Sequence, residues 1–418
     1  MSGARNPGLV AYAAVTAAYW AFMLSDGALR MLVLLHFNGL GFKPIQLAWL
    51  FLLYELAGIV TNLAAGWIAA RFGLAITLWS GLLMQIAALV GLAQLDPSWS
   101  IPLSVGFVMV VQGMSGVAKD LAKMSSKSAV KLLAPKGDGT LFRWVALLTG
   151  SKNAVKGVGF FLGAVLLVLV GFNGAVWGMA AVLAVILAAI WLFMPAGLPM
   201  GSKAAKFSSV WSKDIRVNRL SLARMFLFGA RDVWFVVGIP VYFQAILSDG
   251  TPDGRRFAFF LIGGFMALWI IAYGAVQAAA PKLLNAKGKS EAEIIAKAIA
   301  WAGYLVPIPF ALALAAWVAG APALWLSLVI VTGLLAFGYV FAINSSVHSY
   351  LILAFSKDER VSQDVGFYYM ANAAGRLVGT LLSGVSYQIG GLPLCLATAG
   401  LMATLNWLSV RRLAPKHP

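Results

Sequence analysis

Residues 151–163, SKNAVKGVGFFLG, lie inside an apolar run and have a counterpart half a chain later in residues 372–384, NAAGRLVGTLLSG. With Lys152 aligned on Asn372, Lys156 of the first stretch corresponds to Arg376 of the second, and Gly159 to Gly379. A cation is costly inside an apolar helix, so its repetition at one place indicates a shared function. The two stretches predict a chain built from two related, largely apolar halves.

The rest of the chain is equally apolar. Its 418 residues are 61% hydrophobic and 11% charged, whereas a soluble globular protein carries about 25% charged residues. Apolar runs of about 18 residues or more recur, and each can cross a bilayer as a helix. The sequence predicts an all-α integral membrane protein whose net charge of +17 favours contact with anionic membrane lipid. We expect no nucleic-acid partner.

Twelve apolar spans are separated mostly by short polar, glycine- or proline-containing turns. The longest break, residues 195–216, is basic and divides the spans into two groups of six. We therefore expect an N-terminal half at 1–194, a cytoplasmic linker at 195–216, and a C-terminal half at 217–418. The expected spans are 11–37, 43–70, 74–94, 101–133, 140–170, 173–194, 217–247, 257–284, 291–318, 322–354, 362–388 and 391–411.

Further pairs of segments support a parallel repeat. Residues 52–66, LLYELAGIVTNLAAG, match 268–282, LWIIAYGAVQAAAPK, and Asp26 of the first span sits where Asp232 of the seventh does. Two six-helix halves related in this way resemble the major facilitator superfamily, which binds substrates near the membrane midplane between its halves. The resemblance implies a transporter that alternates between access from either side.

Basic residues of the expected loops gather on one side of the twelve spans. Loops rich in lysine and arginine face the cytoplasm. Both termini and the linker are therefore predicted to be cytoplasmic. The basic residues on this side are Arg5, Arg71, Lys136, Lys203, Lys206, Lys213, Arg216, Lys282, Lys287, Lys289, Lys357, Arg360, Arg411, Arg412 and Lys416.

Residues typical of enzymes are scarce. Cys395 is the single cysteine, and the three histidines are His36, His348 and His417. Neither a zinc-protease, a phosphate-loop nor a serine-hydrolase motif occurs. We expect no metal, no cofactor and no enzymatic activity, so a membrane-embedded enzyme is the weaker alternative.

Charged residues inside the expected spans are the most informative feature. Each costs roughly 2.5–3.5 kcal/mol at the bilayer centre, so such residues usually face a cavity or one another. The spacing of Lys119, Lys123 and Lys127 places all three on one side of their helix. The full set comprises ten basic residues, Arg30, Lys119, Lys123, Lys127, Arg143, Lys152, Lys156, Arg224, Arg231 and Arg376, and four acidic residues, Asp26, Glu55, Asp120 and Asp232.

Some of these charges admit a structural interpretation. Lys127 and Lys131 can reach the cytoplasmic interface along their own aliphatic stems. Arg143 and Arg224 lie early in their helices and can do the same. The ion pairs expected from spacing are Asp26 with Arg30, Asp120 with Lys123 or Lys119, and Asp232 with Arg231.

Ten cations against four acids leave a surplus of positive charge that predicts a small, multiply anionic ligand. Arginine offers a fork of donors suited to tetrahedral oxyanions, and lysine adds point charge. Packing is the alternative role for the aromatic residues and for His348. The candidate substrate-binding residues are Arg30, Lys119, Lys123, Lys127, Lys152, Lys156, Arg231 and Arg376, with Tyr54, Asn344, His348 and Tyr369 as additional polar groups.

Five segments together resemble one specific family, the ArsJ organoarsenical exporters. The resemblance runs through essentially the whole chain. The segments are AYWAFMLSDGALRMLVLLHF (18–37), FLLYELAGIVTNLAAGWIAARFG (51–73), SGVAKDLAKMSSKSAVKLL (115–133), GTLFRWVALLTGSKNAVKGVGFFLG (139–163) and FLFGARDVWFVVGIPVYF (226–243).

This resemblance implies a substrate and a partner. Such exporters carry 1-arseno-3-phosphoglycerate, which glyceraldehyde-3-phosphate dehydrogenase makes when arsenate replaces phosphate. We expect a monomer in the bacterial inner membrane, functionally coupled to that cytoplasmic dehydrogenase. The two anionic ends of the substrate imply two cationic subsites. One is expected at Arg30, Lys119, Lys123 and Lys152, and the other at Arg231, Lys156 and Arg376.

Two questions stay open from the sequence. An organic-phosphate or other organic-anion exchanger would need the same cationic cavity. The energy source is either the membrane potential alone or a proton gradient, for which the candidate coupling groups are Asp26, Glu55, Asp120 and Asp232.

Overall fold

The described part of every expected span is helical in the computed structural model, apart from short breaks. The structure describes residues 7–40, 49–133, 140–193, 198, 200–202 and 211–414. Lys43, Lys136, Lys203, Lys206 and the other basic loop residues outside these ranges are not described. The all-α prediction is therefore confirmed for the described residues.

Five long helices make up the first part of the chain. Glycine at position 171, with φ of 69°, breaks the last of them into two rods and so accounts for two expected spans. The helices are α1 (Pro7–Gly39), α3 (Leu52–Phe72), α4 (Leu74–Leu92), α5 (Ile101–Leu133) and α6 (Thr140–Phe193).

The second part of the chain follows the same plan. A five-residue π-helix interrupts the first span, and a bend at Gly390 and Gly391 divides the last helix into two rods. The elements are α7 (Ile215–Val233), η2 (Trp234–Gly238), α8 (Ile239–Leu247), α9 (Pro252–Leu283), α10 (Glu291–Leu305), α11 (Pro307–Ala319), α12 (Leu324–Phe355) and α13 (Val361–Arg411).

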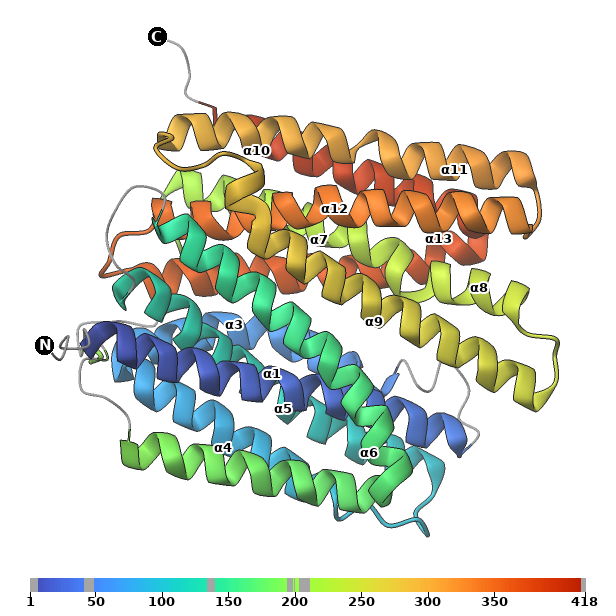
Figure 1. Cartoon of the computed structure of the whole chain (residues 1–418), viewed down its shortest axis with the longest axis horizontal. Helices are drawn as coiled ribbons and strands as arrows, with labels where there is room; N and C mark the ends of the chain where they lie inside the picture. Colours follow the sequence, from blue (N-terminus) through green and yellow to red (C-terminus); the bar gives the residue numbers. More distant parts are fainter. Residues whose placement is uncertain are drawn as a thin grey trace, which may run out of the picture.

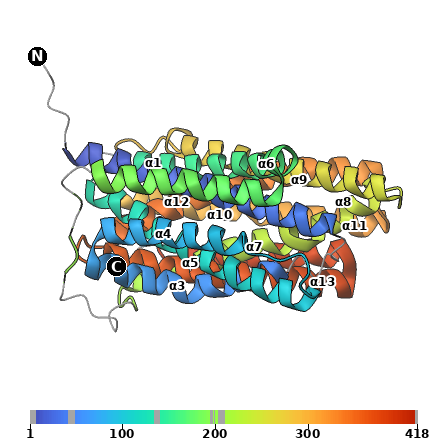
Figure 2. The ribbon, with the colours of Figure 1, turned by 90° about the horizontal axis from the view of Figure 1, so that it is seen from below.

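The helices run along the longest axis of the molecule in both views (Figures 1 and 2). Figure 1 shows α1 and α3–α5 in its lower part, and α7, α8 and α10–α13 in its upper part. The first rod of α6 and helix α9 pass between the two groups. We call the end at which α3 stops and α7 starts the linker end, and the opposite end the far end.

Two close contacts join the two halves of the chain. A Cβ atom at Gly150 of α6 would lie 2.3 Å from the carbonyl oxygen of Gly274 in α9, so only glycine permits this approach. Near the linker end, a Cβ at Gly66 of α3 would lie 2.7 Å from the carbonyl oxygen of Ser362 in α13. Small residues of this kind let membrane helices pack backbone against backbone.

Nine helical stretches of the described chain are long and apolar enough to cross a membrane. The difference from the twelve expected spans has a simple origin. The last two spans form one continuous stretch, Val361–Arg411. The spans at 11–37 and 140–170 form α1 and the first rod of α6, and both carry charged side chains in mid-helix.

Candidate functional site

The charged residues predicted from the sequence converge between the two helix groups. Asp26 and Arg30 come from α1, Tyr54 and Glu55 from α3, and the lysines from α5 and α6. Arg231 and Asp232 come from α7 and Arg376 from α13. Most of these side chains form two clusters, of which one contains acidic residues and the other does not.

The first, which we call the bridging cluster, contains Arg30, Glu55, Arg231, Asp232 and Arg376. Arg376 lies between two acids, with Nη2 2.5 Å from Glu55 Oε1 and Nε 3.2 Å from Asp232 Oδ2. Arg30 Nη2 lies 2.9 Å from the same Glu55 oxygen. Arg231 Nη2 lies 2.5 Å from Asp232 Oδ1. Because Glu55 and Asp232 belong to different groups, the ion pairs connect the groups.

Asp26 lies beside this cluster. Its carboxylate is 2.5 Å from Lys156 Nζ and accepts a 2.8 Å hydrogen bond from the Tyr54 hydroxyl. The expected pair of Asp26 with Arg30 is wrong as a direct contact, because Arg30 extends to Glu55 and Asp26 faces α6. The expected pair of Arg231 with Asp232 is confirmed.

Asp120 on α5 is also fully partnered. Its oxygens lie 2.7 Å from Lys123 Nζ and 3.9 Å from Lys119 Nζ. The hydroxyl of Thr61 and the amide of Asn62 donate to it from α3. The prediction that Asp120 pairs with these two lysines is confirmed.

Lys119 and Lys123 each lie against the face of an aromatic ring. Lys119 Nζ sits 3.8 Å from the centroid of the Tyr54 ring, and Lys123 Nζ sits 4.5 Å from that of Tyr369. A cation over an aromatic face is stabilised without being neutralised. Tyr54 and Tyr369 therefore take part in the site through their rings.

The second, which we call the unpaired cluster, contains Lys127, Lys152 and Arg224. None of the three forms an ion pair with an acid of the described residues. Lys127 donates to the hydroxyl of Thr149. Arg224 donates from Nε to Asn372 Oδ1 at 2.9 Å, and from Nη1 to the side chain of Ser345 at 2.9 Å. These partners are neutral, so no carboxylate of the described residues balances the three side chains.

The members of the unpaired cluster act on one another electrostatically. Hydrogen bonds place them in one region: Lys127 donates to Thr149, which lies on α6 one turn before Lys152. Arg224 and Tyr273 both donate to Ser345, and Asn153, next to Lys152, donates to Gln277, one turn after Tyr273 on α9. Lys123 and Lys156 border the same region. Lys127 and Arg224 are 2% and 3% exposed, so neither reaches the interface along its stem as the structural interpretation would require. Three like charges from both helix groups thus share one buried region.

Buried polar groups without partners border this region. Both ring nitrogens of His348 lack a hydrogen-bond partner, and the residue is 0% exposed. His348 follows Ser345, the partner of Arg224, by three residues on α12. The hydroxyls of Ser349 and Tyr368 also lack a hydrogen-bond partner. Unsatisfied buried polar atoms are uncommon, and a bound water, ion or ligand is one way in which they acquire a partner.

Some expected contributors lie elsewhere. The amide of Asn344 donates to the carbonyl oxygens of Trp301 and Val340, away from the charged clusters. Arg143 is exposed at the linker end, and Lys131 lies 3.8 Å from Asp358 near the same end. Setting Arg143 aside leaves nine cations and four acids in the two clusters and the ion pairs of Asp26 and Asp120 beside them, a surplus of five.

The structure groups the cationic residues differently from the two subsites expected from the sequence. Lys152 lies with Lys127 and Arg224, whereas Arg30 lies with Arg376. Arg224 is the functional candidate that sequence reasoning left out of the binding set. Its signal was the absence of any acid near it in sequence.

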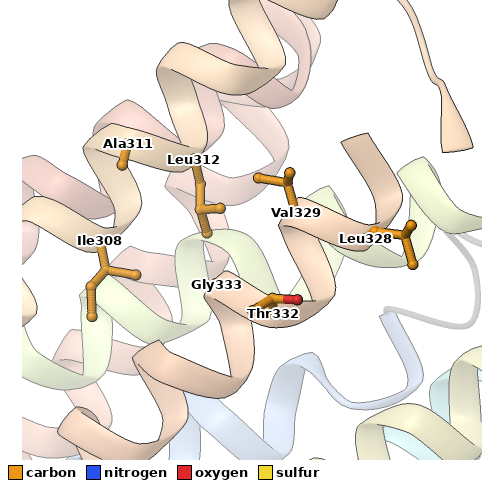
Figure 3. Close-up of a pocket in the computed structure, with 7 residues that line it drawn as sticks. All are labelled: Ile308, Ala311, Leu312, Leu328, Val329, Thr332 and Gly333. Carbon is orange, nitrogen blue, oxygen red and sulfur yellow. The ribbon is translucent and has the colours of Figure 1, made fainter. Parts of the chain in front are cut away.

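No group of three or more potential metal ligands occurs among the described residues. A hollow of about 450 Å³ lies between α11 and α12, and its lining is apolar except for Thr332 (Figure 3). The hollow contains no charged residue and is separate from both clusters.

Comparisons with known proteins identify the fold. No protein-family model and no curated protein matches the chain. Solved structures match the chain over nearly its whole length. Their sequence identities to it are low, so the likeness shows the fold alone. A bacterial homologue of the iron transporter ferroportin, in an outward-facing state, has a TM-score of 0.73 at 12% identity, covering 97% of this chain and 100% of its own.

Two further structures extend the likeness. The proton:xylose symporter XylE of the major facilitator superfamily has a TM-score of 0.74 at 13% identity, covering 98% of this chain and 96% of its own. The human organic anion transporter MFSD10 (TETRAN) has a TM-score of 0.65 at 15% identity, covering 98% of this chain and all of its own. The chain has the major facilitator fold.

Proposed function

We propose that this chain is an efflux transporter that exports 1-arseno-3-phosphoglycerate and so removes arsenate from the cell. The observation that carries the proposal is the surplus of five cations among the buried and half-buried charged residues between the two helix groups. Major facilitator proteins bind their substrates at this place. A surplus held there requires a ligand with several negative charges.

The chemistry of the surplus narrows the ligand further. Arginine forks match the oxygens of a tetrahedral oxyanion, while lysine supplies charge without fixed geometry. The proposed substrate has such a group at each end of a three-carbon chain. The arsenic itself rests on the resemblance of five sequence segments to ArsJ exporters.

The proposed mechanism is alternating access, in which the halves at 1–194 and 217–418 rock around the central site. The bridging cluster would be remade during each cycle, because Arg376 contacts acids of both groups. An anion arriving there competes with Glu55 for the guanidinium groups. The substrate would thereby weaken contacts that hold the halves together.

The membrane potential is sufficient as an energy source. Moving a negative charge out of a negative-inside cell is favoured by about 2.3 kcal/mol per 100 mV. The arsenate ester hydrolyses outside, which keeps its external concentration low. We therefore propose uniport by a monomer of the bacterial inner membrane with cytoplasmic termini, supplied by the cytoplasmic dehydrogenase.

Arsenate efflux from cells tests this proposal. Cells without other arsenate exporters should lose arsenate when they express the chain together with an active glyceraldehyde-3-phosphate dehydrogenase. Loss without the dehydrogenase would indicate a carrier of inorganic oxyanions. Uptake accelerated by internal 3-phosphoglycerate, with no arsenate efflux, would indicate an organic-phosphate exchanger instead.

A further inference from the structure

We infer that the unpaired cluster is the binding site for one tetrahedral dianionic group, a phosphoryl or arsenyl group, with Arg224 as its principal ligand. This inference deepens the proposed function by assigning one end of the substrate to named residues. It differs from a general cationic cavity because the other cations already have acids beside them.

The charge balance of the two regions is the first argument. In the bridging cluster three arginines share two carboxylates, and Asp26 and Asp120 neutralise nearby lysines. Lys127, Lys152 and Arg224 form no ion pair with an acidic residue in the described part of the chain. A buried ion without a counter-charge costs several kcal/mol, so three together are unfavourable. A dianion would neutralise two of the three charges.

The hydrogen bonds of Arg224 are the second argument. Nε and Nη1 are held by Asn372 and Ser345, which fix the plane of the guanidinium. The ring of Phe228, 4.0 Å away, supports one face. Nη2 makes no hydrogen bond within the described residues, so two donors are oriented in advance and available. Preorganised donors of this kind bind oxyanions strongly.

Lys152, Lys127 and His348 supply the remaining donors of the proposed site. Lys152 makes no hydrogen bond with the described residues, and Lys127 uses one of its three N–H groups on Thr149. His348 is 0% exposed, and its ring N–H has no hydrogen-bond partner. The ligands come from α5, α6, α7 and α12, so an anion here contacts both helix groups.

The second anionic group of the substrate would lie toward the far end. Lys156 is one helical turn beyond Lys152, about 6 Å along the axis of α6. It lies beside Asp26, at the edge of the bridging cluster. A three-carbon ligand whose ends are both anionic would fit this spacing, with one end neutralising the unpaired cluster.

Thermal unfolding of the purified full chain in detergent tests the assignment, with inorganic phosphate as the probe and chloride as the reference anion. Phosphate should stabilise the parent chain. Arg224→Gln should weaken the apparent phosphate affinity roughly 10- to 100-fold, as expected for loss of charged hydrogen bonds. Arg219→Gln is the matched control, because Arg219 lies half-buried on the same helix near the linker end, donates to the carbonyl oxygen of Arg412, and loses the same charge.

A second variant keeps the inference testable if Arg224→Gln fails to fold. Lys127→Met removes one uncompensated buried charge, so without phosphate the melting temperature should rise, while stabilisation by phosphate is lost. A merely structural lysine would lower the melting temperature. The inference is overturned if phosphate does not stabilise the parent chain, if Arg224→Gln and Arg219→Gln respond alike, or if Lys127→Met melts lower and still responds.

These outcomes separate the inference from the proposed function. Phosphate binding that depends on Arg224, in a chain that does not move the arsenate ester, would support the site and reject the substrate. Transport of the ester with phosphate binding independent of Arg224 would support the substrate and reject the site.

Discussion

At the scale of single residues, the site depends on which lysines have an acid beside them. Lys123 has Asp120 at 2.7 Å, Lys156 has Asp26 at 2.5 Å, and Lys119 is 3.9 Å from Asp120. Lys119 is therefore the most weakly paired of the three. Its ammonium lies over the Tyr54 ring, where an anion can approach it.

Lys119→Gln should reduce transport by roughly 10- to 100-fold while membrane abundance stays normal, since a charged contact worth about 1.5–3 kcal/mol is lost. Transport of labelled substrate into everted vesicles, normalised to the amount of protein, measures this. Arg143→Gln is the control, because Arg143 is exposed at the linker end. Equal activity of the two variants would show that the face of α5 that bears Lys119 has only a structural role.

Residue-scale contacts were predictable where partners are neighbours in sequence. Arg231 with Asp232, and Asp120 with Lys123, follow from spacing on one helix. Glu55 with Arg376 could not be predicted, because its partners lie 321 positions apart and meet only after the halves pack. The same limit applies to Asp26, whose partner Lys156 comes from another helix.

At the scale of helices, close backbone approach fixes how α6 meets α9. A Cβ at Gly150 would come within 2.3 Å of the Gly274 carbonyl oxygen. The α6 segment that bears Lys152 and Lys156 begins directly after this contact. Spacing between these helices therefore sets the position of both lysines.

Gly150→Val should lower the free energy of unfolding by about 1–3 kcal/mol, the usual cost of overpacking, and should abolish transport. Thermal unfolding together with vesicle transport measures both effects. Gly178→Val is a suitable control on the same helix, because nothing lies within 4 Å of the added Cβ. Normal transport by Gly150→Val would show that the contact does not position the lysines.

Helix existence and approximate bounds were predictable from apolar runs, but breaks inside helices were not. The π-helix at Trp234–Gly238 starts two residues after Asp232 and is followed by Pro240 at the beginning of α8. Proline lacks an amide hydrogen, so it marks a disturbance of the helix here without indicating its form. Such local deviations depend on packing partners that a single sequence does not reveal.

At the scale of the whole molecule, the two groups touch at the linker end. The hydroxyl of Ser362 donates to that of Ser128 at 2.9 Å, and the rings of Phe142 and Tyr350 stack. Alternating access requires these contacts to open during each cycle. The two-half organisation expected from the repeated segments provides the bodies that would move.

A reversible cross-link tests this movement. Ser128→Cys with Ser362→Cys, in a background of Cys395→Ala, should form a disulfide on oxidation, because the two side chains are already in contact. Transport should stop on oxidation and return on reduction. Each single cysteine variant should be unaffected. Undiminished transport by the cross-linked protein would contradict rocking of the halves at this end.

The central claim is that the surplus of positive charge between the helix groups binds an ester with an anionic group at each end rather than inorganic arsenate. Accumulation of labelled arsenate in everted membrane vesicles, supplied with glyceraldehyde-3-phosphate, NAD and purified dehydrogenase, measures this most directly. We predict accumulation that requires all of these components and is lost in Arg224→Gln. Accumulation of arsenate without the dehydrogenase, or none when every component is present, would contradict the account.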